Sequence, residues 1–226
     1  MLRRSHPPKI LLVPLLQFLD ENKTRTLFVS NSGDMYIDRA AVKMGLDVHA
    51  SDSTVLGRCM ATLTSGEKFE LRCNDDELDS IFAHWPGHRF KSLIQIQFAL
   101  KIGEYATRKN DFQKAKYQTC LGEALPFFHK SIQVLEKNKY LDFRVTSFRY
   151  CHFSEHLAQV PQESHCLLNL LNQSVTKTMA FRFVERIFAD DVLFSKQKIE
   201  PDYVNLFQYR SILSSVFSAR RSNYSS

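Results

Sequence analysis

The sequence predicts an α/β fold in a single domain over residues 1–226, interrupted by a helical insertion at about residues 88–139. Two observations predict it. On both sides of the insertion, short β-rich runs alternate with helix-like stretches, which is typical of βαβ units and a parallel sheet. Within the insertion, apolar residues recur at steps of three and four, as on the buried faces of helices. Hydrophobic residues make up 44% of the chain, enough for a core.

The first βαβ unit is expected over residues 26–54. Residues 26–30 (TLFVS) are β-branched and aromatic and predict a strand. From residue 34 to residue 44, apolar side chains fall at helical spacing, and Gly45 stands where such a helix ends. Residues 47–50 (DVHA) predict the second strand.

The other elements follow in chain order. The patterns predict a short strand or helix at 8–22, a helix at 53–64, a strand at 67–73, a short acidic helix after residue 75, helices at 89–107 and 111–138, a strand at 142–148, a short helix at 154–159, a strand at 164–171 and a helix at 176–188. Pro126 is expected to kink or divide the helix over 111–138.

The composition of the chain limits which partners and which cellular compartment are expected. The formal charge is +6 and the sequence pI is about 9.1, which suits phosphate-rich partners but is also common in ordinary soluble proteins. Five cysteines without a CxxC pair favour a reducing cytoplasm over a disulfide framework. The apolar run near the N-terminus is short and broken by Pro14, so no membrane segment is expected.

The turn over residues 30–34 (SNSGD) is the clearest candidate for a ligand site. A strand that ends in a glycine turn and opens a helix presents backbone N–H groups to a ligand at the carboxyl edge of a sheet. Asp52, at the end of the next strand, is placed to accept hydrogen bonds from ribose hydroxyls. The layout is that of a nucleotide- or S-adenosylmethionine-binding unit. The alternative is an ordinary βαβ unit with a loop glycine and a surface aspartate.

Basic residues of the helical insertion form a second candidate, for contact with nucleic-acid phosphates. The members singled out are Arg108, Lys109, Lys114 and Lys116. Three aromatic side chains, Tyr105, Phe112 and Tyr117, are able to stack on bases if they are exposed. The alternative is a solvated helix face.

Histidines and cysteines gather at 151–166, and metal binding is one interpretation of this segment. The members are Cys151, His152, His156, His165 and Cys166. Their spacing matches no standard zinc pattern, so buried thiols and hydrogen-bonded histidines are the favoured interpretation and no metal is predicted. A Walker A loop and a GxSxG turn are both missing from the sequence.

Four segments together resemble DNA adenine-N6 methyltransferases, and more narrowly the small phage and prophage proteins described as antirestriction adenine methyltransferases. The segments are residues 28–52, 68–82, 103–117 and 143–170. The resemblance implies a Rossmann-like sheet of the S-adenosylmethionine methyltransferase type. It also implies methyl transfer from that cofactor to adenine in double-stranded DNA.

The resemblance also implies roles for particular residues. S-adenosylmethionine would lie against Asn31, Gly33 and Asp34, with its ribose at Asp52. Asn169 would orient the target amine at the position of a catalytic tetrapeptide, and the basic insertion would hold the DNA backbone. Residues 169–172 read NLLN, without the two prolines and the aromatic residue of that tetrapeptide.

That departure keeps a catalytically impaired member among the expectations. A non-catalytic nucleic-acid- or protein-binding module on the same scaffold is an alternative from another class. A different nucleotide-binding enzyme is a third, because one Gly-Asp turn does not choose among cofactors.

Overall fold

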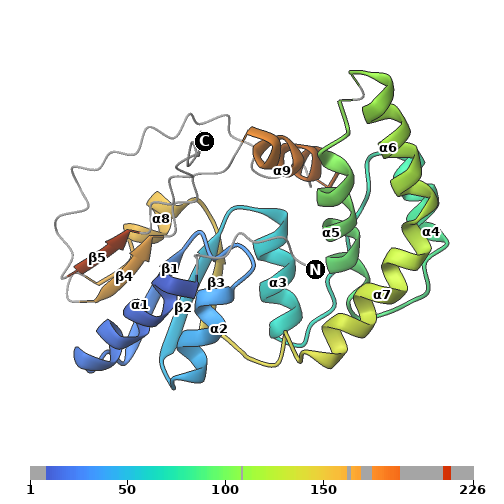
Figure 1. Cartoon of the computed structure of the whole chain (residues 1–226). Helices are drawn as coiled ribbons and strands as arrows, with labels where there is room; N and C mark the ends of the chain where they lie inside the picture. Colours follow the sequence, from blue (N-terminus) through green and yellow to red (C-terminus); the bar gives the residue numbers. More distant parts are fainter. Residues whose placement is uncertain (1–8, 108, 162–163, 169–174, 189–210, 215–226) are drawn as a thin grey trace, which may run out of the picture.

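The computed structural model describes residues 9–107, 109–161, 164–168, 175–188 and 211–214, and shows a parallel sheet beside a block of helices (Figure 1). The strands are β1 Thr26–Ser30, β2 Asp47–Asp52, β3 Ser147–Tyr150, β4 His165–Leu168 and β5 Ser211–Ser214. The helices are α1 Lys9–Glu21, α2 Tyr36–Lys43, α3 Val55–Thr64, α4 Asp76–Ala83, α5 Lys91–Gly103, α6 Asp111–Gly122, α7 Ala124–Lys137, α8 Phe153–Leu157 and α9 Val175–Phe188.

The sheet has the order β3-β2-β1-β4-β5, and each neighbouring pair of strands is parallel. The predicted α/β class is therefore confirmed. The order is compatible with a Rossmann-like sheet, in which the chain first builds outward from β1 and then crosses to its other side. Between β1 and β4 lies the switch point of the topology, the place where open α/β sheets bind ligands beyond their carboxyl ends.

Residues of β1 alternate between two cores, as a period of two requires. Leu27 and Val29 belong to the main core, which α1, α2 and α3 share, whereas Phe28 packs in a smaller cluster with Phe153 and Leu157 of α8. The sheet is thus covered on one face by α1–α3 and carries α8 on the other (Figure 1).

The helical block comprises α4, α5, α6 and α7 and follows α3 in the chain. Its centre is aromatic, with Trp85 between Phe82, Phe98 and Phe128 at ring-centroid distances of 4.8 to 5.7 Å. The predicted division of 111–138 is confirmed, because α6 ends at Gly122 and α7 begins at Ala124. Pro126 lies in the first turn of α7, where its missing N–H leaves no helical hydrogen bond unmade.

Helix α9 leaves the sheet after β4 and packs on α5 of the helical block (Figure 1). The two helices approach closely at Gly103, where an added Cβ would lie 2.9 Å from the Cα of Ala180. The glycine therefore permits a contact that a larger residue would prevent.

Two predicted strands differ from the structure. Residues 67–73 form no strand, although residues 69–75 alternate between half-buried and exposed. Phe69 and Leu71 pack on the main core, and the Ser92 hydroxyl donates to the Phe69 carbonyl, so the alternation comes from an irregular segment lying along α5. The strand expected at 142–148 is displaced to Ser147–Tyr150, and its pairing with β2 starts where Thr146 N donates to Val48 O at 2.8 Å.

Candidate functional site

The loop between β1 and α2 has an unusual backbone. Asn31, Gly33 and Met35 all adopt the left-handed region, with φ of 59°, 56° and 56°. Asparagine and glycine tolerate this conformation, but for a buried methionine it is uncommon and must be held by the surroundings. Internal hydrogen bonds hold it, since Ser32 N donates to Ser51 O at 3.0 Å and Met35 N donates to Ser32 O at 2.9 Å.

Asp52 joins this loop to the start of α3. Its Oδ2 accepts a hydrogen bond from Gly33 N at 2.6 Å, and its Oδ1 accepts one from Thr54 N at 2.6 Å. Gly57 of α3 leaves room for the side chain, because an added Cβ there would lie 2.7 Å from Asp52 Oδ1. Gly57 is a site residue that the sequence pattern did not single out; the only signal was a glycine inside a helix, where it costs stability.

Four acidic side chains are buried around this position, and we call them the carboxyl cluster: Asp34, Asp38, Asp52 and Glu185. Ser32 Oγ donates to Asp38 Oδ1 at 2.9 Å, and Val55 N donates to Glu185 Oε1 at 3.0 Å. The second oxygens, Asp38 Oδ2 and Glu185 Oε2, are buried without a hydrogen-bond partner. The sequence did not predict Asp38 and Glu185 as site residues. Each lies on an amphipathic helix, where an acidic side chain normally faces solvent.

Burial and mutual repulsion shift the ionisation of the cluster. Burial raises the pKa of Asp38 to about 7, and the charges of Asp34 and Asp52 act in the same direction. Burial likewise raises the pKa of Glu185 to about 7, with the charge of Asp52 adding to it. The pKa of Asp52 is also raised by burial, against the hydrogen bonds that it accepts. The cluster is therefore an environment in which a positive charge is stabilised.

The loop is poorly suited to cradle a phosphate. Of its N–H groups, those of Ser32, Gly33 and Met35 already donate within the protein, and Tyr36 N donates to Asp34 Oδ1 at 3.3 Å. A phosphate site needs such groups directed at the ligand, and negative side chains beside it repel an anion. The geometry thus argues against ligands held by a diphosphate.

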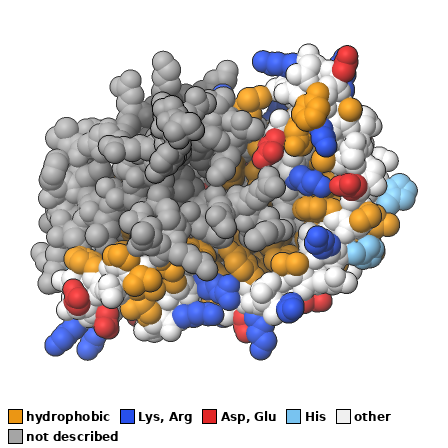
Figure 2. Space-filling model, viewed as in Figure 1, with side chains coloured by type: hydrophobic (Ala, Val, Ile, Leu, Met, Phe, Trp, Pro, Cys, Tyr) orange, Lys and Arg blue, Asp and Glu red, His pale blue; other side chains and the backbone are white. Residues whose placement is uncertain are grey.

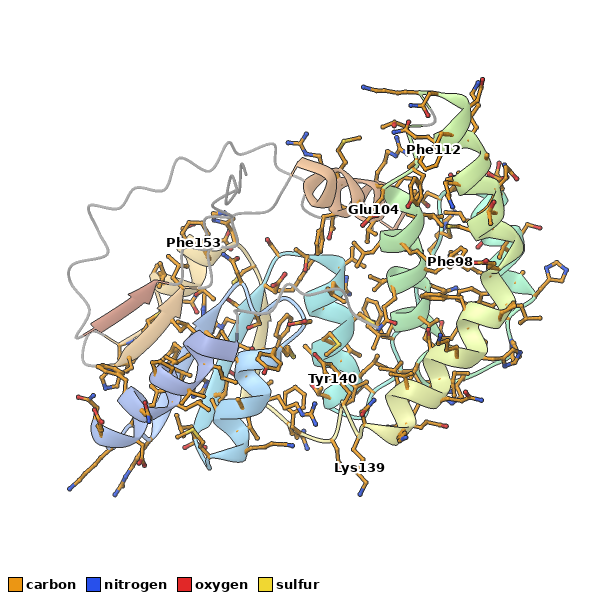
Figure 3. All side chains as sticks on the ribbon, in the orientation of Figure 1. Phe98, Glu104, Phe112, Lys139, Tyr140 and Phe153 are labelled. Carbon is orange, nitrogen blue, oxygen red and sulfur yellow. The ribbon has the colours of Figure 1, made fainter. Side chains whose placement is uncertain are left out.

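Tyr140, which follows α7, connects the helical block with the loop. The hydroxyl of Tyr140, which is labelled in Figure 3, donates to the Asp34 carbonyl at 3.3 Å. The Arg39 guanidinium lies 5.1 Å from the centre of the Tyr140 ring. Burial raises the pKa of the Tyr140 hydroxyl, with the charge of Asp34 adding to the effect, so it stays a neutral donor. The loop is consequently sensitive to the position of α7.

On the opposite face of the sheet, a hydrogen bond of 2.9 Å joins Ser30 Oγ to His156 Nδ1. Burial lowers the pKa of His156 to about 4, helped by the charges of Arg149 and His49, so its ring is neutral at pH 7. In the described part of the chain, no group of three or more His, Cys, Asp or Glu side chains is arranged to hold a metal ion. All five cysteines lie in that part, and they are free thiols.

The described basic residues that were predicted to contact nucleic acid lie on α6 or just before it. Lys109 is exposed, Lys114 forms an ion pair with Asp111 at 3.2 Å, and Lys116 lies 5.9 Å from the ring centre of Phe112. Phe112 is 63% exposed at the outer end of α6 (Figure 3). On the visible face of the block, Lys and Arg side chains are interspersed with Asp and Glu (Figure 2).

Not every predicted contact residue is available to a ligand. Tyr117 is fully buried, so the condition for stacking on a base, an exposed ring, is not met; its side chain fills the contact between α6 and the rest of the block instead. Arg108 and Asn169 lie outside the described residues. Asn169 directly follows Leu168, which pairs with Ser30 in the register of the sheet.

Comparison with protein-family models, with curated proteins and with solved structures gives no match for this chain. In the part of the chain that the structure describes, the helices are too short or too polar to cross a membrane.

Proposed function

We propose that the chain is an S-adenosylmethionine-dependent DNA adenine-N6 methyltransferase-like protein of the cytoplasm. In this proposal Asn31, Gly33 and Asp34 lie against the cofactor, and Asp52 accepts hydrogen bonds from its ribose. The observation that carries it is the carboxyl cluster at the carboxyl edge of β1 and β2, beside the switch point of the sheet.

The charge of the cluster supports this choice among cofactors. S-adenosylmethionine carries a sulfonium and an ammonium group and no phosphate, whereas dinucleotides present a diphosphate to the same edge of such sheets. Buried carboxyls favour the first and oppose the second. Asp52 already accepts hydrogen bonds from Gly33 N and Thr54 N, and in this proposal its carboxylate accepts the ribose hydroxyls in addition.

The distribution of charge supports a nucleic-acid partner. Residues 88–139 hold ten Lys or Arg against four Asp or Glu, so their net charge equals the +6 of the whole chain. The rest of the chain is balanced, and the surplus is concentrated in residues 88–139, the segment that carries Lys109, Lys114 and Lys116. Such a surface neutralises phosphates of double-stranded DNA and makes binding depend on salt.

The proposed catalytic group is Asn169, which would orient the adenine amine. Because NLLN at 169–172 provides no aromatic residue for the extruded base, low activity is part of the proposal. A binding module without catalysis remains the second candidate. The lack of an aromatic residue in NLLN also favours this candidate.

Calorimetric titration with S-adenosylmethionine tests the cofactor assignment. Wild type is expected to bind, and Asp52→Ala to lose most of the affinity, since the loop loses the bond at Gly33. Asp47→Ala is the matched control, because it removes an exposed aspartate from the other end of β2. Absence of binding to wild type at high micromolar cofactor would rule out the assignment.

A second measurement separates the enzyme from the binding module. Wild type is incubated with methyl-labelled cofactor and unmethylated double-stranded DNA. Label in adenine N6 supports the enzyme. Tight cofactor binding without any label in DNA would support the module.

A further inference from the structure

We propose that Asp38 makes the cofactor site selective for the positively charged methyl donor over its neutral product. The inference rests on the proposed cofactor and adds to it a residue that sets specificity. Asp38 is fully buried in the first turn of α2, beneath the loop that carries Asn31, Gly33 and Asp34.

One oxygen of Asp38 is satisfied and the other is not. Ser32 Oγ donates to Oδ1, which fixes the carboxyl against the loop, while Oδ2 is buried without a partner. A buried polar oxygen without a partner is costly in a folded protein, and such exceptions are characteristic of functional sites. A bound cation would remove that cost.

Within the described part of the chain, no side chain supplies a cation to this carboxyl. Asp38 forms no ion pair with a described residue, and the neighbours that influence it are the carboxyls of Asp34 and Asp52. The nearest cationic side chain in sequence, Arg39, lies over the Tyr140 ring instead. A buried carboxyl with acidic neighbours and no ion pair to a described residue favours a ligand that brings its own positive charge.

Methyl transfer would change the charge of the bound cofactor. It breaks the sulfur–methyl bond with the electron pair left on sulfur, forms the nitrogen–methyl bond and releases one proton from the amine. The sulfonium becomes a neutral thioether, so the product carries one positive charge less than the donor. A site with buried carboxylates therefore retains the donor more strongly than the product.

Titration calorimetry with two ligands tests the inference: S-adenosylmethionine and S-adenosylhomocysteine, which differ by the methyl group and its charge. Wild type is expected to bind the first at least about tenfold more tightly, a modest effect for one buried charge. Asp38→Asn keeps the oxygen that accepts from Ser32 and removes the charge that Asp38 carries above its pKa of about 7, so both proteins are titrated at a pH above that value. The variant is expected to weaken the first ligand and to leave the second unchanged, which brings the ratio close to one.

Asp47→Asn is the matched control, because it removes an exposed aspartate and should leave the ratio as in wild type. The wild-type ratio is informative even if Asp38→Asn fails to fold. Equal affinities in wild type, or an unchanged ratio in Asp38→Asn, would overturn the inference while the cofactor assignment stands. If neither ligand binds wild type, both proposals fail.

Discussion

Gly57 lies directly against the side chain of Asp52, and an added Cβ at Gly57 would lie 2.7 Å from Asp52 Oδ1. The same oxygen accepts from Thr54 N at 2.6 Å, so it is confined on two sides. A residue of α3 without a side chain thus determines where the most connected carboxylate of the site lies.

Gly57→Ala is expected to destabilise the protein by about 1 to 3 kcal/mol, because overpacking displaces Asp52 and its bonds to the loop. Denaturant unfolding measures the loss, and calorimetry should show weaker cofactor binding. Gly122→Ala is the matched control, since an added Cβ there meets nothing within 4 Å. Equal stability of Gly57→Ala and Gly122→Ala would show that Asp52 has room to move.

The raised pKa values of Asp38 and Glu185 predict a stability that falls as pH rises from about 4 to about 7. Over that range the unfolded chain releases both protons while the folded chain retains them. Each group therefore lowers the free energy of unfolding by up to about 1.4 kcal/mol per pH unit. Asp38 faces Asp34 and Asp52 as well as the neutral Tyr140, and these groups keep its proton bound.

Urea unfolding of Asp38→Asn and Glu185→Gln at pH 5, 6 and 7 measures the effect. Each variant should lose stability less steeply than wild type as pH rises. Asp47→Asn, an exposed aspartate, should follow wild type. Parallel curves for Asp38→Asn and wild type would mean that Asp38 is ionised throughout.

His156 predicts the opposite dependence. Its pKa is lowered to about 4, so its contribution is complete above the unfolded value of about 6.5 and is lost as pH falls through 4. Between these limits it offsets one of the two carboxyls, so the fall of wild-type stability with pH should be about half of what Asp38 and Glu185 would give together. His156→Gln is expected to lose stability more steeply than wild type with rising pH. The same urea series tests this, and an unchanged slope would contradict it.

Binding of double-stranded DNA should depend on Lys114 and Lys116. The double variant Lys114→Ala/Lys116→Ala is expected to reduce the slope of log affinity against log salt by about two, one for each lost phosphate contact. Fluorescence anisotropy over a salt series measures it. Lys43→Ala, on α2 outside the block, removes an exposed lysine as the control. A slope equal to that of wild type in the double variant would exclude α6 from the interface.

Local sequence patterns predicted the strands whose two faces meet different surroundings. In residues 26–30 and 47–50 the side chains point alternately to the two faces of the sheet, so the type and approximate bounds of these strands could be predicted. Residues 67–73 alternate for another reason, because the segment lies half-buried along α5 without a partner strand. Burial with a period of two therefore indicates a surface on one side and does not by itself indicate a hydrogen-bonded ladder.

The sequence predicted only those site residues that the order of strands and helices along the chain brings together. Gly33 and Asp52 are nineteen residues apart, and the βαβ layout brings them together. Glu185 reaches Val55 across a sequence separation of 130, and its position depends on how α9 packs against α3 and α5. Nothing in the local sequence around Glu185 distinguishes it from a solvated helical acid.

Because of the path of α9, the helical block cannot be removed without disturbing the rest of the fold. The chain leaves β4, lies against α5 at Gly103 and Ala180, and returns to pair β5 with β4. Excision of residues 88–139 would remove Gly103, against which Ala180 and Phe183 of α9 lie. The insertion and the sheet are therefore expected to unfold as one cooperative unit, and a shortened chain without the block to aggregate.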